Sequence, residues 1–157
     1  MSGTAYAEAW ERAEAGLFRY LCRALGHRPG VEAYRLEDLP RGMPTLGAAG
    51  VVWAFSISGG PIGVHRQSRT EIPRGLWEMN AEFTGRCGSA AAARRLGCQV
   101  LEALPAGPED VRGVIRLYAT EHPSVERKLA PATSAERAGE EAIVFEVQVP
   151  LKAVFTT

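Results

Sequence analysis

The residues of this chain that could carry out chemistry are few and widely spaced. Two pairs of adjacent carboxylates stand out, Glu37-Asp38 and Glu140-Glu141. Paired acid–base catalysis needs two carboxyl groups that converge on one substrate, whereas adjacent residues of a strand or a helix point in different directions. Both pairs therefore favour a solvated surface over a catalytic pair.

The three histidines are equally isolated. His27, His65 and His122 lack the H-x-x-x-H or H-E-x-x-H spacing that places two imidazole rings on one face of a helix. The chain also lacks the G-x-S-x-G turn that presents a nucleophilic serine. A catalytic set brought together only by the tertiary fold stays an open alternative. From the sequence we predict no enzyme, no metal site and no cofactor.

The three cysteines, Cys22, Cys87 and Cys98, are odd in number and form no C-x-x-C pair. Cys22 and Cys98 lie in apolar helical patterns, where a thiol behaves as a small hydrophobic side chain. We therefore expect buried, reduced cysteines.

One local motif suggests an anion-binding turn. Residues 85–89 predict a turn from a strand into a helix, and Gly85, Arg86, Gly88 and Ser89 are the residues that would hold an anion. Glycines at a helix N-terminus let backbone amides approach an anion, and the helix dipole favours negative charge there. The simpler interpretation is a pair of turn glycines followed by a serine N-cap. The anion-binding module is the alternative to the function inferred below.

Two segments are longer than ordinary connections. Residues 59–75 contain His65, Arg66, Arg69 and Arg74 against a single acidic residue, and residues 122–141 are polar, with alanine, proline and serine. Loops longer than ~12–15 residues are uncommon in compact domains and are usually functional or disordered. We predict that the arginines of the first loop contact an assembly partner; a solvated hairpin connection is the alternative.

The elements that must position these residues follow from hydrophobic periodicity. Apolar residues recur every three or four positions in residues 4–25 and 89–104, which predicts two amphipathic helices. Alternation of apolar and polar residues predicts strands at 31–36, 50–58, 76–84, 114–121 and 143–155. We therefore expect one α+β domain spanning residues 1–157, in the order α-β-β-β-α-β-β. Its mainly antiparallel sheet would carry both helices on one face.

The last two strands carry specific expectations. The alternation in residues 114–121 predicts that Ile115, Leu117 and Ala119 share the core-facing side. In residues 143–155 every odd position is apolar, and Pro150 falls in the middle of the strand. Proline cannot donate to a ladder, so we expect this strand to lie at a sheet edge or to bend there.

Composition excludes several classes of protein. The 157 residues are 46% hydrophobic and 23% charged, ordinary values for a globular domain. Eighteen basic and eighteen acidic residues cancel, so the basic excess typical of nucleic-acid binding is missing. No secretory signal is apparent at the N-terminus, and no apolar stretch approaches the ~20 residues of a membrane span. We expect a cytosolic protein without specific nucleic-acid or membrane partners.

The order of elements resembles the tail terminator and minor tail proteins of long-tailed phages, including those carried in prophages. The resemblance rests on GLFRYLCRAL in the first helix and on LWEMNAEFTGRCG running into SAAAARRLGCQVLEAL, and residues 76–104 match best. It implies a subunit of a homomeric ring, commonly a hexamer, in the host cytoplasm during assembly and then in the virion tail. Such a ring caps the tail tube, stops its polymerisation and meets the head–tail connector. The family supplies no catalytic residues, and residues 122–141 have no counterpart in it.

Overall fold

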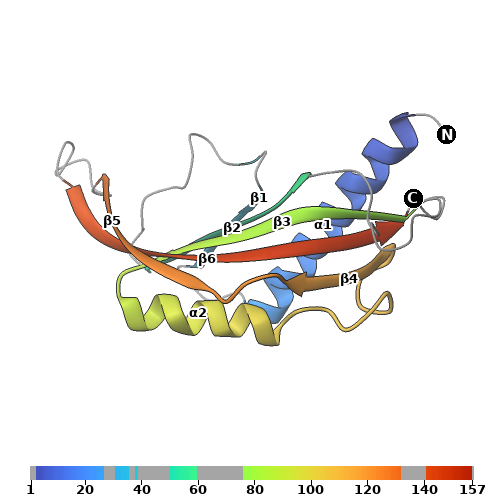
Figure 1. Ribbon diagram of the computed structural model, residues 1–157. Coiled ribbons are helices and arrows are strands. Elements are labelled where there is room, and N and C mark those ends of the chain that lie inside the picture. Colours follow the sequence, from blue (N-terminus) through green and yellow to red (C-terminus); the bar gives the residue numbers. More distant parts are fainter. Residues whose placement is uncertain are drawn as a thin grey trace.

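The computed structural model describes residues 3–26, 31–35, 38, 50–59, 76–131 and 141–156. Within these ranges it contains two helices and six strands (Figure 1). Their order is α1 (Gly3–Leu25), β1 (Val31–Arg35), β2 (Val51–Gly59), β3 (Leu76–Cys87), α2 (Ala90–Glu102), β4 (Val114–Ala119), β5 (Ser124–Pro131) and β6 (Glu141–Thr156). The predicted α+β class and order are confirmed, and β5 is an additional strand.

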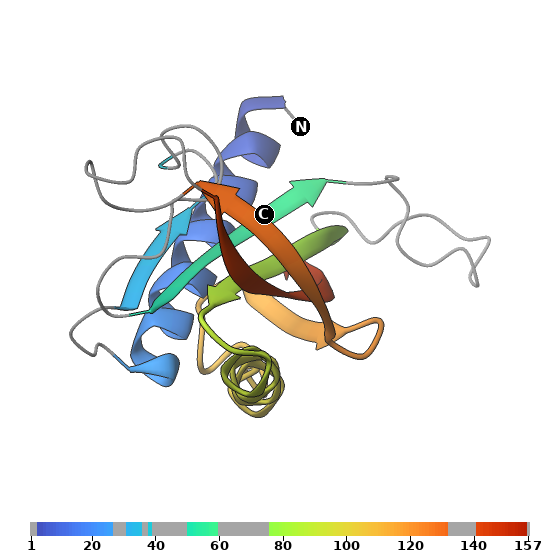
Figure 2. The ribbon, with the colours of Figure 1, turned by 90° about the vertical axis from the view of Figure 1, so that its left-hand side faces the viewer.

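The strands form one mixed sheet in the order β1-β2-β3-β6-β4, and β5 also pairs with β6. β1 and β2 run parallel, and every other pair is antiparallel. In the view along the axis of α2 the strands cross one another at steep angles, so the sheet is strongly twisted (Figure 2). β6 is the longest strand, and it pairs with three others along its length.

One face of the sheet forms the core beneath both helices. The register places Phe55, Phe83 and Val149 side by side on this face, and all three are fully buried. Trp53 stacks on Phe83 with ring centroids 5.2 Å apart. The helices contribute the side chains that cover this face, and the most deeply buried of them are Ala9, Ala13, Leu17, Leu21, Ala93 and Val100. The prediction that two amphipathic helices cover one face is confirmed.

Close packing of α2 on the sheet requires glycine at two positions. A Cβ at Gly85 of β3 would lie 2.5 Å from Leu96 Cδ2, and one at Gly97 of α2 would lie 2.9 Å from Pro123 Cβ. Contacts below 3.0 Å essentially never occur at real Cβ atoms. The N-cap of α2 is Ser89, as predicted, because its Oγ accepts a 3.1 Å hydrogen bond from the Ala92 N–H.

The prediction that residues 122–141 form a loop is wrong for their first half, since Ser124–Pro131 is strand β5. β4 and β5 are two parts of one antiparallel run along β6. β4 ends with Ala119 opposite Leu151, and β5 begins with Ser124 opposite Gln148. Residues 132–140 lie outside the described residues.

The junction of β4 and β5 explains how Pro150 is tolerated in a central strand. β6 lies between β3 on one side and β4 and β5 on the other, so the expectation of an edge strand is wrong. The Pro150 carbonyl accepts a 3.0 Å bond from the Thr120 N–H, directly after β4. In an antiparallel ladder the N–H and C=O of one residue point to the same neighbouring strand. The missing N–H of Pro150 therefore points to the gap between β4 and β5, where no strand residue needs a hydrogen-bond donor from β6.

The predicted core face of β4 is right for Leu117 and Ala119, which belong to or pack against the core, and wrong for Ile115. A register shift separates Val114 from Arg116, and such a bulge inserts one extra residue into the strand. Val114 and Leu117 are buried, whereas Ile115 is 40% exposed. Alternation in the sequence does not reveal the bulge, because Ile115 is as apolar as its neighbours.

Candidate functional site

The residues predicted to contact an assembly partner, His65, Arg66, Arg69 and Arg74, lie outside the described residues. Their predicted role stays a prediction.

The residues of the predicted anion-binding turn do not come together as one loop. β3 runs to Cys87, so Gly85 and Arg86 belong to the strand, and only Gly88 and Ser89 form the turn. Gly85 faces the core, where Leu96 lies against it. Arg86 points to the opposite face of the sheet, with its Nε 3.0 Å from Glu146 Oε2. Ser89 Oγ is occupied as the cap of α2.

The cysteines and histidines form no reactive centre in the part of the chain that the structure describes. Cys87 is buried, and burial raises the pKa of its thiol to about 11. Burial also raises the pKa of Cys22. Cys98 is exposed, which corrects the expectation that it is buried. His122 is exposed, and the described residues contain no group of three or more His, Cys, Asp or Glu side chains placed to bind a metal ion.

A buried carboxylate organises the face of the sheet opposite the helices. Glu146 of β6 is only 4% exposed. Its Oε1 lies 2.7 Å from Lys128 Nζ and accepts from Gln148 Nε2 at 3.1 Å, while Oε2 accepts from Arg86. Burial alone raises the pKa of Glu146, but the hydrogen bonds from Lys128, Arg86 and Gln148 outweigh burial and hold it below its ordinary value. The cluster joins β3, β5 and β6, and it holds the charge of Glu146 between two cations.

A second polar cluster joins β3, β4 and β6 on the same face. The Tyr118 hydroxyl donates to Glu78, whose Oε1 is also 3.8 Å from Lys152 Nζ. The guanidinium of Arg116 lies 4.5 Å from the centroid of the Tyr118 ring, within the range of a cation–π contact. Burial and the hydrogen bond to Glu78 raise the pKa of Tyr118 to about 12. Tyr118 therefore stays protonated near neutral pH and ties strands together.

Side chains of α1 complete the hydrogen bonding of β2 beyond the end of β1. The pairing of β1 with β2 ends at Phe55. Two residues further on, the Ile57 N–H donates to Glu14 Oε2 at 2.9 Å, and the Ile57 carbonyl accepts from Trp10 Nε1 at 3.0 Å. Arg35 Nη2 lies 3.2 Å from the other oxygen of Glu14. Two helical side chains thus take the place of a neighbouring strand.

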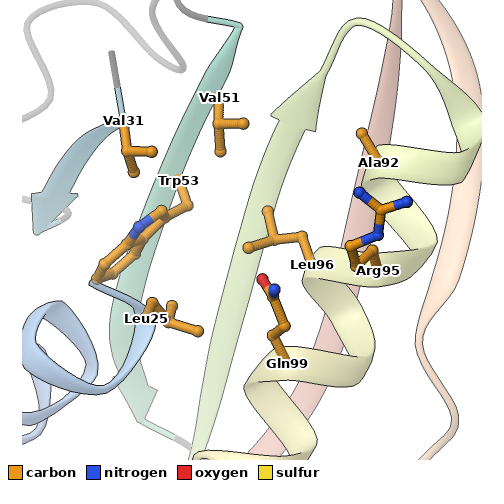
Figure 3. A pocket seen from close by; sticks show the side chains of 8 residues that line it. All are labelled: Leu25, Val31, Val51, Trp53, Ala92, Arg95, Leu96 and Gln99. Atoms are coloured by element: carbon orange, nitrogen blue, oxygen red, sulfur yellow. The ribbon is translucent and has the colours of Figure 1, made fainter. Parts of the chain in front are cut away.

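The described hollows are small. One of about 140 Å³ lies between the end of α1, the start of β1 and β2, and α2 (Figure 3). Leu25 and Trp53 line one side of it, Leu96 lines the other, and Arg95 and Gln99 are its polar side chains. A second hollow, of about 210 Å³, is bounded by Trp10, Glu14 and Arg35, which already bind one another or β2. Glu11 also lines the second hollow, but its other two charged groups, Glu14 and Arg35, are bound to each other.

The two outermost strands are the other candidate surface. In the described part of the chain, β1 pairs only with β2, and β4 and β5, which follow one another along β6, pair only with β6, so each has a second edge without a paired strand. β3 pairs with β6 only as far as Phe145, whereas β5 continues to Glu141. The ends of β5 and β6 therefore project past β2 and β3 (Figure 1). On this projection Leu129 lies opposite Ile143, and they are 66% and 45% exposed.

Comparison of the chain with protein-family models and with curated proteins finds no match to either. No helix among the described residues is long and apolar enough to cross a membrane.

Sequence reasoning missed β5, which forms one of these two edges. Its central residues Glu126, Arg127 and Lys128 are consecutive charges, and charges are depleted in strands. Val125 and Leu129, four positions apart, share one face of β5 with Arg127 between them. This weak alternation is the available signal, and charged residues are a common feature of edge strands.

Proposed function

We propose that this chain is a structural subunit that assembles with copies of itself into a closed ring. We further propose that the ring is a tail terminator or tail-completion component of a long-tailed phage, where its partners are the end of the tail tube and the head–tail connector.

The observation that carries the proposal is the pair of strand edges at opposite sides of one sheet that have no paired neighbour among the described residues. Such an edge presents unpaired N–H and C=O groups, which are a template for pairing with another chain. Two different edges on one subunit allow each copy to contact two neighbours through non-identical surfaces. Contacts of this head-to-tail kind generate rings when the rotation between subunits closes.

The polar clusters support a structural role for the described residues. Glu146, Glu14 and Glu78 are each matched by cations or by hydrogen-bond donors of the same chain. Each cluster joins elements that are distant in sequence. Groups used in this way stabilise an arrangement of strands, and they are not left available for a substrate.

The phage role rests on the resemblance carried by residues 76–104. In this structure the span comprises β3, the Ser89 cap and α2. The anion-binding alternative is not favoured by these contacts, because Gly85 faces the core and Arg86 is bound to Glu146.

Assembly is tested by size-exclusion chromatography with light scattering over a range of concentrations, followed by negative-stain electron microscopy of the concentrated protein. We expect a species with a fixed number of subunits and a central hole, and the resemblance makes six the expected number. A strictly monomeric chain at every concentration would contradict the proposal.

The tail role is tested separately, by assembling phage particles without this subunit. A terminator stops tube polymerisation, so tubes longer than normal are expected. Tubes of normal length, together with a ring by microscopy, would overturn the terminator role and leave the ring subunit.

A further inference from the structure

We propose that neighbouring subunits of this ring join by antiparallel pairing of β1 of one subunit with β5 of the next. This inference rests on the proposed ring and specifies its interface. The partner is a second copy of the chain, and five residues of each strand take part.

The strand directions fit this junction. β2 runs parallel to β1, and β3, β6 and β5 then alternate in direction across the sheet. β5 therefore runs opposite to β1. When a second copy is placed edge to edge with its helices on the same side, its β1 meets β5 as an antiparallel neighbour. One sheet can then continue from subunit to subunit.

The faces of the two strands restrict the register. Val31 and Ala33 share the helix-covered face with Trp53, and Val125 and Leu129 share it with Val147. Directly opposed residues of an antiparallel pair lie on the same face, so an odd-numbered residue of β1 must face an odd-numbered residue of β5. Allowed registers therefore differ by steps of two residues.

One of the allowed registers is chemically complementary at three of its five residue pairs and opposes no like charges; the other two pairs place Ala33 opposite Arg127 of the partner subunit and Arg35 opposite Val125 of the partner subunit. It places Val31 opposite Leu129 of the partner subunit and Glu32 opposite Lys128 of the partner subunit. Tyr34 then faces Glu126 of the partner subunit, a carboxylate that can accept from its hydroxyl in place of Glu32, to which the hydroxyl donates at 3.0 Å within the subunit. Glu32 is exposed, the side chain of Glu126 is 63% exposed and that of Lys128 is 37% exposed, and Leu129 is the most exposed large apolar residue described.

The neighbouring registers are unfavourable. A shift of two residues one way places Glu32 opposite Glu126 of the partner subunit. A shift the other way places Arg35 opposite Arg127 of the partner subunit. Like charges directly opposite one another destabilise a strand pair. The charges therefore select a single register.

The selected register also has the stagger that a closed sheet needs. Within one subunit, directly paired residues connect Val31 with Arg127 straight across the sheet. The residues between them are Val51 of β2, Cys87 of β3 and Phe145 of β6. At the junction Val31 faces Leu129 of the partner subunit, two residues further along β5. At about 3.3 Å per residue this is a shift of roughly 7 Å per subunit. Closure of a sheet requires tilted strands and a fixed stagger of this kind.

Pairing of β5 with a second β5 across a two-fold axis is the competing arrangement. The register that matches Glu126 with Lys128 of the partner subunit also opposes Arg127 to Arg127 of the partner subunit. This pairing would produce dimers, because an isologous interface uses the same surface twice. The junction of β1 with β5 avoids this repulsion. It also leaves one edge of each of the two joined subunits unused, so that the next subunit can add there.

Disulfide trapping tests the junction in a Cys98→Ser background. The informative variant carries Tyr34→Cys and Glu126→Cys, since opposed Cβ atoms lie about 4.5–5.5 Å apart, close to disulfide geometry. The matched control carries Tyr34→Cys and Arg127→Cys, whose side chains leave opposite faces of the sheet. Mild oxidation followed by non-reducing electrophoresis should give a ladder of dimers, trimers and larger species for the first variant, and monomers for the control.

A charge reversal gives a second readout. Glu32→Lys should weaken association about threefold to tenfold per junction, because an opposed ion pair becomes a repulsion. Glu82→Lys is the control, since Glu82 is exposed on the same face but lies on a central strand. Under the competing two-fold pairing Glu32→Lys would have no effect.

The outcomes separate this interface from the ring itself. A covalent ladder with weakened association of Glu32→Lys supports the junction. Rings by microscopy without the ladder would overturn the junction and leave the proposed ring. A chain that does not assemble at any concentration would overturn both.

Discussion

Glu146 lies 2.7 Å from Lys128, and this contact ties the edge strand β5 to the centre of the sheet. The same carboxylate binds Arg86 of β3 at 3.0 Å. A nearly buried anion held by two cations keeps β5 in a fixed position along β6. In the proposed subunit junction, the cluster holds β5 by the edge that pairs with β6, and the opposite edge of β5 meets the next subunit.

Replacement of Glu146 by glutamine should destabilise the fold by about 2–4 kcal/mol, because two cations lose their buried counter-charge. The free energy of unfolding from urea denaturation measures the effect. Glu126→Gln is the matched control, because the Glu126 side chain is 63% exposed and its contact with Lys128 is long, at 3.8 Å. The free energy of unfolding should change by less than about 1 kcal/mol for this variant. Equal effects of the two variants would contradict the role of Glu146.

The same cluster predicts acid sensitivity. The pKa of Glu146 is lowered in the folded state, so the unfolded chain binds the proton more tightly, and stability from this group rises with pH. The contribution is fully present above the unfolded pKa of ~4.3 and is lost as pH falls through the lower folded pKa. Urea denaturation between pH 6 and pH 3 should show a steeper loss of stability for the wild type than for Glu146→Gln. Parallel curves would contradict this.

Two glycines near the start of α2 should respond in opposite ways to alanine. Gly85→Ala places a Cβ 2.5 Å from Leu96 Cδ2, and overpacking of this kind costs about 1–3 kcal/mol. At Gly88 a Cβ meets nothing within 4 Å, and its φ is not positive. Gly88→Ala should therefore be neutral or stabilise by up to about 1 kcal/mol. Thermal or urea unfolding of both variants provides the comparison, and a destabilised Gly88→Ala would point to an unrecognised role for the turn.

Periodicity predicted the helices and the long strands because the faces that they turn to the core are mostly apolar. β6 is the clearest case, with Val147, Val149 and Leu151 on the core side. Ser89 was predicted as a cap from its position before an alanine-rich run, and its hydrogen bond to Ala92 confirms this.

The errors have local physical causes. The bulge at Ile115 changes the face without changing the apolar pattern. β5 was missed because its side chains form ion pairs at an edge, where apolar character is not needed. The partners of Glu146 could not be predicted from spacing, since Arg86 is 60 residues away and only the register of β3 on β6 brings the two together.

Glu14 provides a last test of how the helices hold the sheet. Glu14→Ala removes the acceptor of the Ile57 N–H and the counter-charge of Arg35, at a site where Glu14 is 9% exposed. An unsatisfied buried amide costs about 1–3 kcal/mol, and the free energy of unfolding should fall by this amount or more. Glu11→Ala, one turn away and exposed, should change it by less than about 0.5 kcal/mol. Hydrogen exchange should show faster exchange of the Ile57 amide in Glu14→Ala alone, because this amide depends on the helix for its partner. If the Ile57 amide of Glu14→Ala exchanged as slowly as in the wild type, the hydrogen bond from α1 would not be what protects this amide.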